Sequence, residues 1–299
     1  LLSHTASVRD YDDQYAIPLG GSLRAVLADP RSWDAEHAPG SGYFAYSNLN
    51  FPIIASVMER VTGERFDLWI RRDVLEPMKL DACFNWPTCS DAALARAVVL
   101  TQGGKPIRDD LRGRLPSCPV FVREGEPCDL STWRPGENGA LFSPQGGLRI
   151  SGRDLARIGR MLLNGGKLDG VRILSPSSVA LLLRPQWRYN GRNGSQEGES
   201  AGVCSYGLAS QQLGSRVAGC RDSLRGDGRS WVGHAGSAYG LRSGLWIDPA
   251  RGVGVAYFRT GLDDRSDTSS AEAGAFRRTL GLLKARPYSA RRVQSTSER

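Results

Sequence analysis

Three adjacent side chains, those of Tyr46, Ser47 and Asn48, bring a phenol, a hydroxyl and an amide together. They directly precede a predicted helix over 52–60, which would hold them on a short, fixed segment. A phenol and an amide positioned in this way can transfer a proton and orient a polar substrate. The alternative is a polar turn that only caps the helix, and the spacing alone does not choose between the two.

The helix behind this segment is predicted from apolar residues that recur at helical intervals. These residues are Ile53, Ile54, Val57, Met58 and Val61. Asn48 or Asn50 can cap the start of the helix. Pro52 suits its first turn, and Gly63 is placed to end it.

A second stretch, residues 198–202, matches the G-x-S-x-G pattern in which a nucleophilic serine follows a strand and precedes a helix. The serine is Ser200. Asp222 or Asp227 and then His234 follow in the order of a Ser-Asp-His triad. The context argues against this role, because a Gly- and Asn-rich loop precedes Ser200 and a strand-like run follows it. We therefore do not expect Ser200 to be a nucleophile.

The sequence has few side chains suited to a metal centre. Its only histidines are His4, His37 and His234, and none of its six cysteines belongs to a Cys-x-x-Cys pair. No zinc-binding spacing results, and we expect neither a metal nor another cofactor. His4 is interpreted as a structural loop anchor. His234 is either a binding residue or a hydrogen-bonded histidine at a strand edge.

The cysteines are candidates for disulfides. Short separations make the pairs Cys118–Cys128 and Cys204–Cys220 plausible. The alternative is that the cysteines are free thiols in or near the core.

Composition and charge are those of an ordinary globular protein. Of the 299 residues, 40% are hydrophobic and 23% charged, and the formal net charge is +8. The arginines are scattered apart from a cluster over 286–299, and no basic stripe alternates with aromatic residues, so we do not expect nucleic-acid binding. No run approaches the ~18 apolar residues of a membrane-spanning helix.

Around the candidate residues, the pattern changes from helical to strand-like along the chain. Further helices are predicted over 22–27, 66–75, 151–164 and from 175 onward, strands over 206–210, 231–234, 241–247 and 253–258, and a closing helix over 271–283. Residues 81–143 are predicted to be irregular. Helices followed by strands and a final helix indicate an α+β fold.

Four stretches resemble the serine hydrolases that include class C β-lactamases, D-Ala-D-Ala carboxypeptidases and related esterases and amidases. They are Leu1-Leu2-Ser3-His4-Thr5, the run Phe44-Ala45-Tyr46-Ser47-Asn48 with Val61-Thr62-Gly63 behind it, the segment from Gly147 to Gly170, and His234-Ala235-Gly236. The resemblance covers nearly the whole chain. It implies a β-lactamase/transpeptidase-like fold, with a mostly antiparallel sheet flanked by helices and a helical subdomain.

The same resemblance implies one domain over 1–285, followed by a disordered basic tail over 286–299. Within the domain, helices and loops are expected over 1–200, and strands with the closing helix over 201–285. The family is usually periplasmic or secreted, so we expect that location here, and disulfides are favoured over free thiols.

By resemblance, Tyr46 is the general base or proton relay and Asn48 hydrogen-bonds the substrate amide. A free tyrosine titrates near pH ~10, so Tyr46 needs a neighbouring cation to act as a base. His234, Gly236 and Ser237 are expected to bind substrate, and the strand backbone at Ser237 to help stabilise an oxyanion. His234 stands where β-lactamases use a lysine, which favours the esterases and amidases of the family over its β-lactamases.

The nucleophile of the family is a serine followed three residues later by a lysine, and no serine of the 299 residues has a lysine at that distance. The family places this pair ahead of the run that here spans residues 1–5. The resemblance therefore implies either a truncated member without the nucleophile helix and first strands, or a whole but degenerate one.

The two cases predict different functions. A truncated member belongs to a serine hydrolase that cleaves an amide or ester bond, in a β-lactam, a D-amino-acid peptide or an ester, through an acyl-enzyme. Its remaining residues alone would be inactive. A degenerate member is a non-catalytic protein that binds a peptide or cell-wall-like ligand. In both cases the expected partner is a small molecule or peptide, and the sequence does not indicate an oligomeric state.

Overall fold

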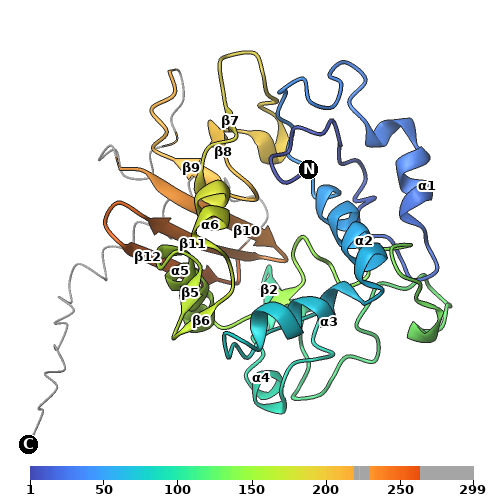
Figure 1. The fold of residues 1–299 in the computed structure, drawn as a ribbon. Coiled ribbons are helices and arrows are strands. Elements are labelled where there is room, and N and C mark those ends of the chain that lie inside the picture. The colour runs from blue at the N-terminus through green and yellow to red at the C-terminus, as the bar shows by residue number, and fades with distance from the viewer. Residues whose placement is uncertain (219–221, 223–228, 263–299) are drawn as a thin grey trace, which may run out of the picture.

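The computed structural model describes residues 1–218, 222 and 229–262. It joins an antiparallel sheet with a covering helix to a group of helices and long loops (Figure 1). The predicted helix over 271–283 and the predicted tail lie outside the described residues, as do Cys220 and Asp227.

The longer helices and strands follow the predicted order. The helices are α1 (Leu23–Ala28), α2 (Asn50–Thr62), α3 (Phe66–Ile70), which continues as a π-helical turn (Arg71–Leu75), α4 (Asp91–Ala95), α5 (Gly152–Leu163) and α6 (Pro176–Leu183). The strands are β1 (Cys83–Phe84), β2 (Leu100–Gln102), β3 (Lys105–Arg108), β4 (Leu148–Arg149), β5 (Lys167–Leu168), β6 (Val171–Arg172), β7 (Trp187–Arg188), β8 (Ser205–Tyr206), β9 (Gln211–Leu213), β10 (Trp231–Ala238), β11 (Leu241–Asp248) and β12 (Val253–Arg259). Helix α4 and the short strands β1 to β7, all within residues 1–200, were not predicted.

The main sheet has six strands in the order β12-β11-β10-β9-β8-β7, each antiparallel to its neighbour. Its longest hairpin, β10–β11, turns at Tyr239 and Gly240, both with positive φ, which suits the right-handed twist of the strands. The single strand predicted over 206–210 is wrong. Residues 207–210 form a turn between β8 and β9, closed by a bond from the Gly207 N–H to the Ser210 carbonyl.

Helix α5 covers one face of this sheet and packs on β11 and β12 (Figure 1). Its predicted start is confirmed, because Ser151 caps it by accepting a hydrogen bond from the Asp154 N–H at 3.0 Å. Gly159 allows a close approach, since a Cβ there would lie 2.9 Å from Leu245 Cδ1 of β11.

Helix α2 exists where it was predicted, but its buried face differs from the prediction. Val57 and Val61 are 56% and 80% exposed, whereas Ser56 and Glu59 are buried. The physical reason is the irregular segment 136–139, which packs directly on α2. Ser56 Oγ accepts from the Gly139 N–H at 2.8 Å, and Glu59 accepts from the Gly136 N–H at 3.3 Å. Buried polar side chains here satisfy the backbone of a loop that has no sheet partner.

The predicted N-cap of α2 is also wrong. The cap residue is Leu49, which has no oxygen in its side chain, and neither Asn48 nor Asn50 supplies the bond. The C-terminal prediction is confirmed, because Gly63 ends the helix in the left-handed conformation with φ 72°.

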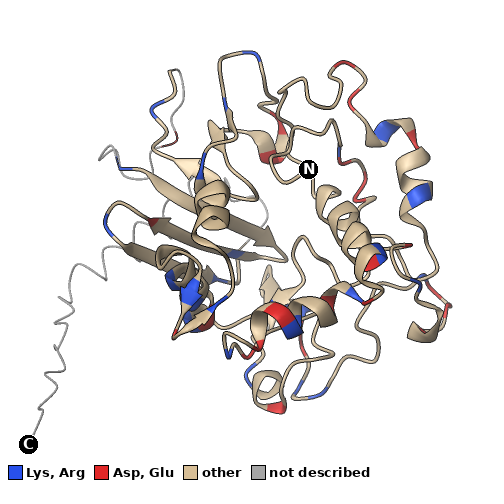
Figure 2. Ribbon diagram, viewed as in Figure 1, with Lys and Arg blue, Asp and Glu red and all other residues tan. Residues whose placement is uncertain are grey.

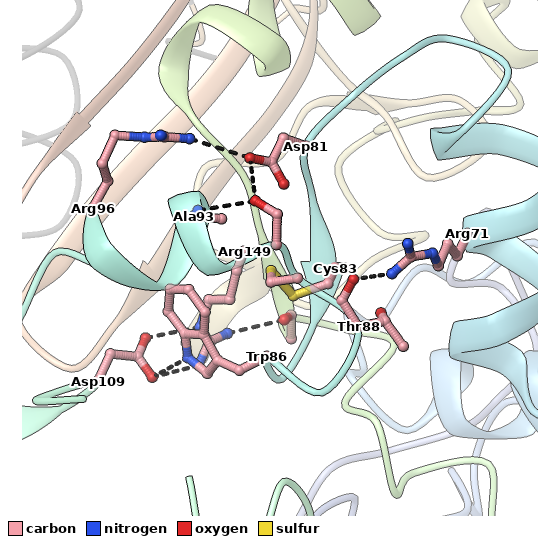
Figure 3. Close-up of a disulfide and its surroundings, with 12 residues drawn as sticks. Arg71, Asp81, Cys83, Trp86, Thr88, Ala93, Arg96, Asp109 and Arg149 are labelled. Atoms are coloured by element: carbon pink, nitrogen blue, oxygen red, sulfur yellow. Dashed lines mark hydrogen bonds and ion pairs between the residues drawn. A yellow bond between two sulfur atoms is a disulfide. The ribbon is translucent and has the colours of Figure 1, made fainter. Parts of the chain in front are cut away.

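Residues 81–143 contain only short elements, as predicted, and two disulfides cross-link them. Cys118–Cys128 was expected, and Cys83–Cys89 accompanies it. Near the Cys83–Cys89 disulfide, Asp109 accepts hydrogen bonds from Trp86 Nε1 and from Arg149 (Figure 3). Two disulfides and the Asp109–Arg149 ion pair thus hold a segment whose backbone ladders are short.

Basic and acidic residues are interspersed along several elements of the ribbon (Figure 2). Among the described residues, no helix has the length and apolar character needed to cross a membrane.

Candidate active site

Tyr46 lies between two histidines that come from distant parts of the chain. Its ring stacks on His4 with centroids 4.2 Å apart, and the ring of His234 on β10 lies 5.8 Å away. Burial raises the pKa of Tyr46 well above its usual value, and the nearby carboxylates of Glu199 and Asp10 raise it further. In these surroundings the phenol keeps its proton, so a cation is required before Tyr46 can act as a base.

His4 cannot supply that cation. His4 is 2% exposed, and burial lowers its pKa to about 3. Nδ1 accepts from the Ser47 N–H at 3.1 Å and lies 3.1 Å from Asn50 Nδ2, so the proton of the neutral ring is on Nε2. His4 therefore anchors the loop, as the sequence predicted, and its ring stacks on that of Tyr46.

Asp10 holds the segment that carries Tyr46. Its carboxylate accepts from Ser47 Oγ at 2.6 Å, from the Asn48 N–H at 2.6 Å and from the Leu49 N–H at 3.1 Å. The bond from Leu49 satisfies one backbone N–H at the start of α2, where the Leu49 side chain offers no cap. Asn48 Nδ2 donates to Asp10 Oδ2 at 3.1 Å and to Glu199 Oε2 at 3.2 Å. Asp10 is thus both the helix cap and the positioning group for Asn48.

His234 is held in one tautomer. Its Nε2 lies 2.9 Å from the Tyr206 hydroxyl, and its Nδ1 lies 2.5 Å from the Ala235 carbonyl oxygen. A carbonyl only accepts, so Nδ1 carries the proton and Tyr206 donates to Nε2. Burial raises the pKa of Tyr206 and lowers the pKa of His234, so the pair is neutral.

The strand beyond His234 has one open edge. Within the described residues, β10 pairs with β9 from Trp231 to Gly233 and no further. The residues of β10 beyond Gly233 are therefore paired with β11 alone. Gly236 allows the close approach of Ser243, whose Oγ would lie 2.6 Å from an added Cβ. Ser237 stands at the exposed end of the strand. Unpaired backbone groups of this edge are suited to bind an extended ligand.

Ser200 lies at the site but not as an elbow nucleophile. It ends a 3₁₀ turn over 198–200, is 3% exposed, and its Oγ accepts from the Tyr46 N–H at 2.8 Å. The expectation against a nucleophilic role agrees with this placement, because no strand leads into the turn and no helix follows.

The structure brings Tyr46 and His234 together and places Asn48 beside the carboxylates of Asp10 and Glu199. Among the described residues, Ser237 forms no hydrogen bond with any of these side chains. Sequence reasoning missed Asp10, Glu199 and Tyr206. Asp10 gave no local signal, because its partners lie 37 to 39 residues further along the chain.

A separate cavity of about 360 Å³ lies beside the Cys83–Cys89 disulfide and is lined by Arg71, Asp81 and Thr88 among others (Figure 3). Arg71 already donates to the Thr88 carbonyl and to Glu76. None of the candidate site residues lines this cavity. Within the described part of the chain, no group of three or more His, Cys, Asp or Glu side chains is placed to hold a metal ion.

Comparisons with known proteins agree with the sequence resemblance. The sequence profile of the Beta-lactamase family matches residues 1–277. Penicillin-binding protein 4 of Amycolatopsis lactamdurans is 24% identical over 298 residues, which cover 95% of this chain and 63% of that protein. The chain thus spans less than two thirds of this curated relative.

Solved structures with the same fold include a class C β-lactamase mutant, with a TM-score of 0.58 and 14% identity over 93% of this chain and 69% of that one. D-amino acid amidase from Ochrobactrum anthropi SV3, complexed with D-phenylalanine, gives the same TM-score and identity over 95% of this chain and 76% of that one. The predicted fold is confirmed at this level, as a β-lactamase/transpeptidase-like arrangement of helices around an antiparallel sheet. On the match over residues 1–277, this chain belongs to the β-lactamase family.

Proposed function

We propose that this chain is part of a serine hydrolase that cleaves an amide or ester bond through an acyl-enzyme, with the nucleophilic serine and its lysine outside these 299 residues. The observation that carries the proposal is the convergence of Tyr46 and His234, whose rings lie 5.8 Å apart although they come from distant parts of the chain. Both residues belong to motifs that the family places at its active site.

The chemistry follows from the protonation states. The serine hydroxyl attacks the carbonyl carbon, and its proton passes through the Tyr46 oxygen to the leaving amine or alcohol; water then releases the acid and regenerates the serine. Because burial and two carboxylates raise the pKa of Tyr46, this relay needs the lysine ammonium nearby. Backbone N–H groups on the open edge of β10 are suited to stabilise the oxyanion.

The neutral state of His234 supports an amidase or esterase over a β-lactamase. Both of its ring nitrogens have partners, so it offers no cation to a substrate carboxylate. The amidase from Ochrobactrum anthropi, whose structure holds D-phenylalanine, makes a D-amino-acid derivative a reasonable substrate class. The two disulfides support a periplasmic or secreted location.

One observation favours the alternative of a non-catalytic protein that binds a peptide or cell-wall-like ligand. Within the described part of the chain, no lysine or arginine is hydrogen-bonded to Tyr46 or stacked on its ring, and both histidines beside it are neutral. Such a site binds a ligand without activating a nucleophile.

The deciding experiment begins with the intact mass and N-terminal sequence of the protein from its native source. A protein that carries Ser-x-x-Lys in addition to these residues should be labelled by a fluorophosphonate. Tyr46→Phe should slow the labelling by about 100-fold or more, which is typical for loss of a general acid–base group.

Tyr43→Phe is the matched control, because Tyr43 stacks on His37 three residues from Tyr46 and should label at the normal rate. Equal labelling of the Tyr46→Phe and Tyr43→Phe variants would contradict the role of Tyr46. A native protein without Ser-x-x-Lys would favour the binding alternative.

A further inference from the structure

The segment that carries Tyr46 pairs with a distant loop through a short parallel ladder. The Phe44 N–H donates to the Asn193 carbonyl at 2.9 Å, and the Ser195 N–H donates to the Phe44 carbonyl at 2.8 Å. In a regular parallel ladder the next bond would run from the Tyr46 N–H to the Ser195 carbonyl. Among the described residues the Tyr46 N–H does not take this acceptor, so it needs another one.

The hydroxyl of Ser200 takes the place of that carbonyl. The chain turns away from the ladder after Ser195, whose Oγ accepts from the Glu197 N–H at 3.2 Å. It returns in the 3₁₀ turn Gly198–Ser200, and Ser200 Oγ then accepts from the Tyr46 N–H at 2.8 Å. A side chain thus continues the pairing at the point where the backbone has left it.

The same turn accounts for the G-x-S-x-G pattern around Ser200. Gly198 and Gly202 have φ values of 53° and 73°, in the left-handed region that favours glycine. Between them, Ser200 is 3% exposed, and its carbonyl accepts from the Val203 N–H at 3.1 Å. The two glycines let the backbone bend on both sides of Ser200, so the pattern here directs a buried hydroxyl at the Tyr46 backbone.

The backbone of Tyr46 matters because few contacts hold its phenol. Among the described residues the Tyr46 hydroxyl forms no hydrogen bond, and the ring is held by packing, with the His4 ring at 4.2 Å and the Tyr206 ring at 6.5 Å. Removing the Ser200 hydroxyl would leave the Tyr46 N–H without its acceptor, so the backbone would be free to move. A displacement of about 1 Å at a reacting group can lower a rate by about 100-fold.

We propose that Ser200 is a positioning residue for Tyr46. Its hydroxyl fixes the Tyr46 backbone against the loop over 193–200 and thereby sets where the phenol lies relative to His234 on β10. This inference rests on the proposed function for the part that Tyr46 has in proton transfer. The placement of the ring itself can be tested without catalysis.

The first test follows fluorophosphonate labelling of the protein that carries Ser-x-x-Lys, in a double-mutant cycle. Ser200→Ala should slow the labelling by about ten-fold or more, because the phenol is no longer held in place. In the Tyr46→Phe background the same substitution should change the rate by less than about two-fold, since the group through which Ser200 acts is already gone. Equal factors in the two backgrounds would overturn the inference.

Ser210→Ala is the matched control for a purely structural role. Ser210 is 4% exposed, and its Oγ donates to the Leu182 carbonyl at 3.1 Å, so this substitution also removes a buried hydroxyl with one backbone partner. Both alanine variants should lose stability in urea unfolding, but only Ser200→Ala should slow the labelling. Equal slowing in both variants would show that labelling reports lost stability, and the inference would fail.

A readout without catalysis separates this inference from the proposed function. The ¹H–¹³C resonances of the Tyr46 ring, assigned by their absence in Tyr46→Phe, report how the ring lies on its stacking partner His4. They should shift in Ser200→Ala and stay in place in Ser210→Ala, and unshifted resonances in Ser200→Ala would contradict the inference even in a protein that is labelled. If the native protein is not labelled, the proposed function fails, and the ring resonances alone decide whether Ser200 positions Tyr46.

Discussion

At the scale of single residues, the site is built from groups that burial keeps uncharged. The pKa of Tyr46 is raised, and the pKa values of His4 and His234 are lowered, in each case chiefly by removal from water. Among the described residues, the carboxylates that act on Tyr46 are those of Glu199 and Asp10. Proton transfer here therefore depends on a positive charge that the neighbouring histidines do not provide.

His4 makes a prediction about stability at low pH. The pKa of His4 is about 3 in the folded protein and about 6.5 in the unfolded chain, so between these values the unfolded chain binds a proton that the folded protein does not. Stability should be full above pH ~6.5 and should fall on acidification, by up to about 1.4 kcal/mol per pH unit from this group.

Urea unfolding between pH 7 and pH 4 measures this loss. His4→Asn keeps an acceptor for the Ser47 N–H and should flatten the pH dependence, while His37→Gln controls for the removal of a histidine as such. The same pH dependence in His4→Asn and wild type would mean that His4 is not held neutral.

At the scale of elements, α2 depends on partners outside itself. Asp10 caps its start, and the loop over 136–139 covers its buried face. The close fit is clearest at Gly139, where an added Cβ would lie 2.4 Å from both the Pro52 carbonyl oxygen and the Ser56 nitrogen. Both of these are backbone atoms, so the helix itself would have to move.

Gly139→Ala should therefore destabilise the protein by about 3 kcal/mol or more, in the range of severe overpacking. Gly146→Ala is the matched control, because nothing lies within 4 Å of an added Cβ there and its φ is not positive. The control should stay within about 0.5 kcal/mol of wild type in urea unfolding. Equal midpoints for the two variants would show that the loop does not pack on α2 as described.

Elements with their own local signals were predictable from the sequence. Helices α5 and α6 begin where they were predicted, with Ser151 and Ser175 as their caps. Strands β11 and β12 match the predicted ranges closely, and β10 begins at Trp231 as predicted but continues to Ala238. The buried face of α2 was not predictable, because it is selected by an irregular loop that the sequence could not position. The catalytic candidates came from motif resemblance, whereas Glu199 and Tyr206 depend on contacts between distant segments.

At the scale of the whole molecule, the site lies where the two parts of the fold meet. The segment with Tyr46 comes from the helical part and His234 comes from the sheet. Phe44 and Tyr206 join them in one buried cluster, and the Phe44 ring stacks on Trp187 of β7 at 4.5 Å. Any relative movement of the two parts would therefore change the distance between Tyr46 and His234.

The disulfides stabilise the part of the molecule with the fewest regular elements. Replacing Cys118 and Cys128 together by serine should cost about 2–3 kcal/mol, because the cross-link closes a short loop in the unfolded chain. A lower thermal midpoint in this double variant, and in wild-type protein under reducing conditions, is the expected result. An unchanged midpoint in both would show that packing alone holds this segment.

The bonds that shape the Tyr46–Asn48 segment also have a consequence for folding kinetics. Ser200 is 154 residues from Tyr46, and Asp10 is 38 residues from Asn48. Contacts of high sequence separation form late, because loop closure must come first. Helices α5 and α6, with caps of their own, can form early, whereas the Tyr46–Asn48 segment requires nearly the complete topology. A refolding chain should therefore regain its helical signal before the Tyr46–Asn48 segment reaches its final arrangement.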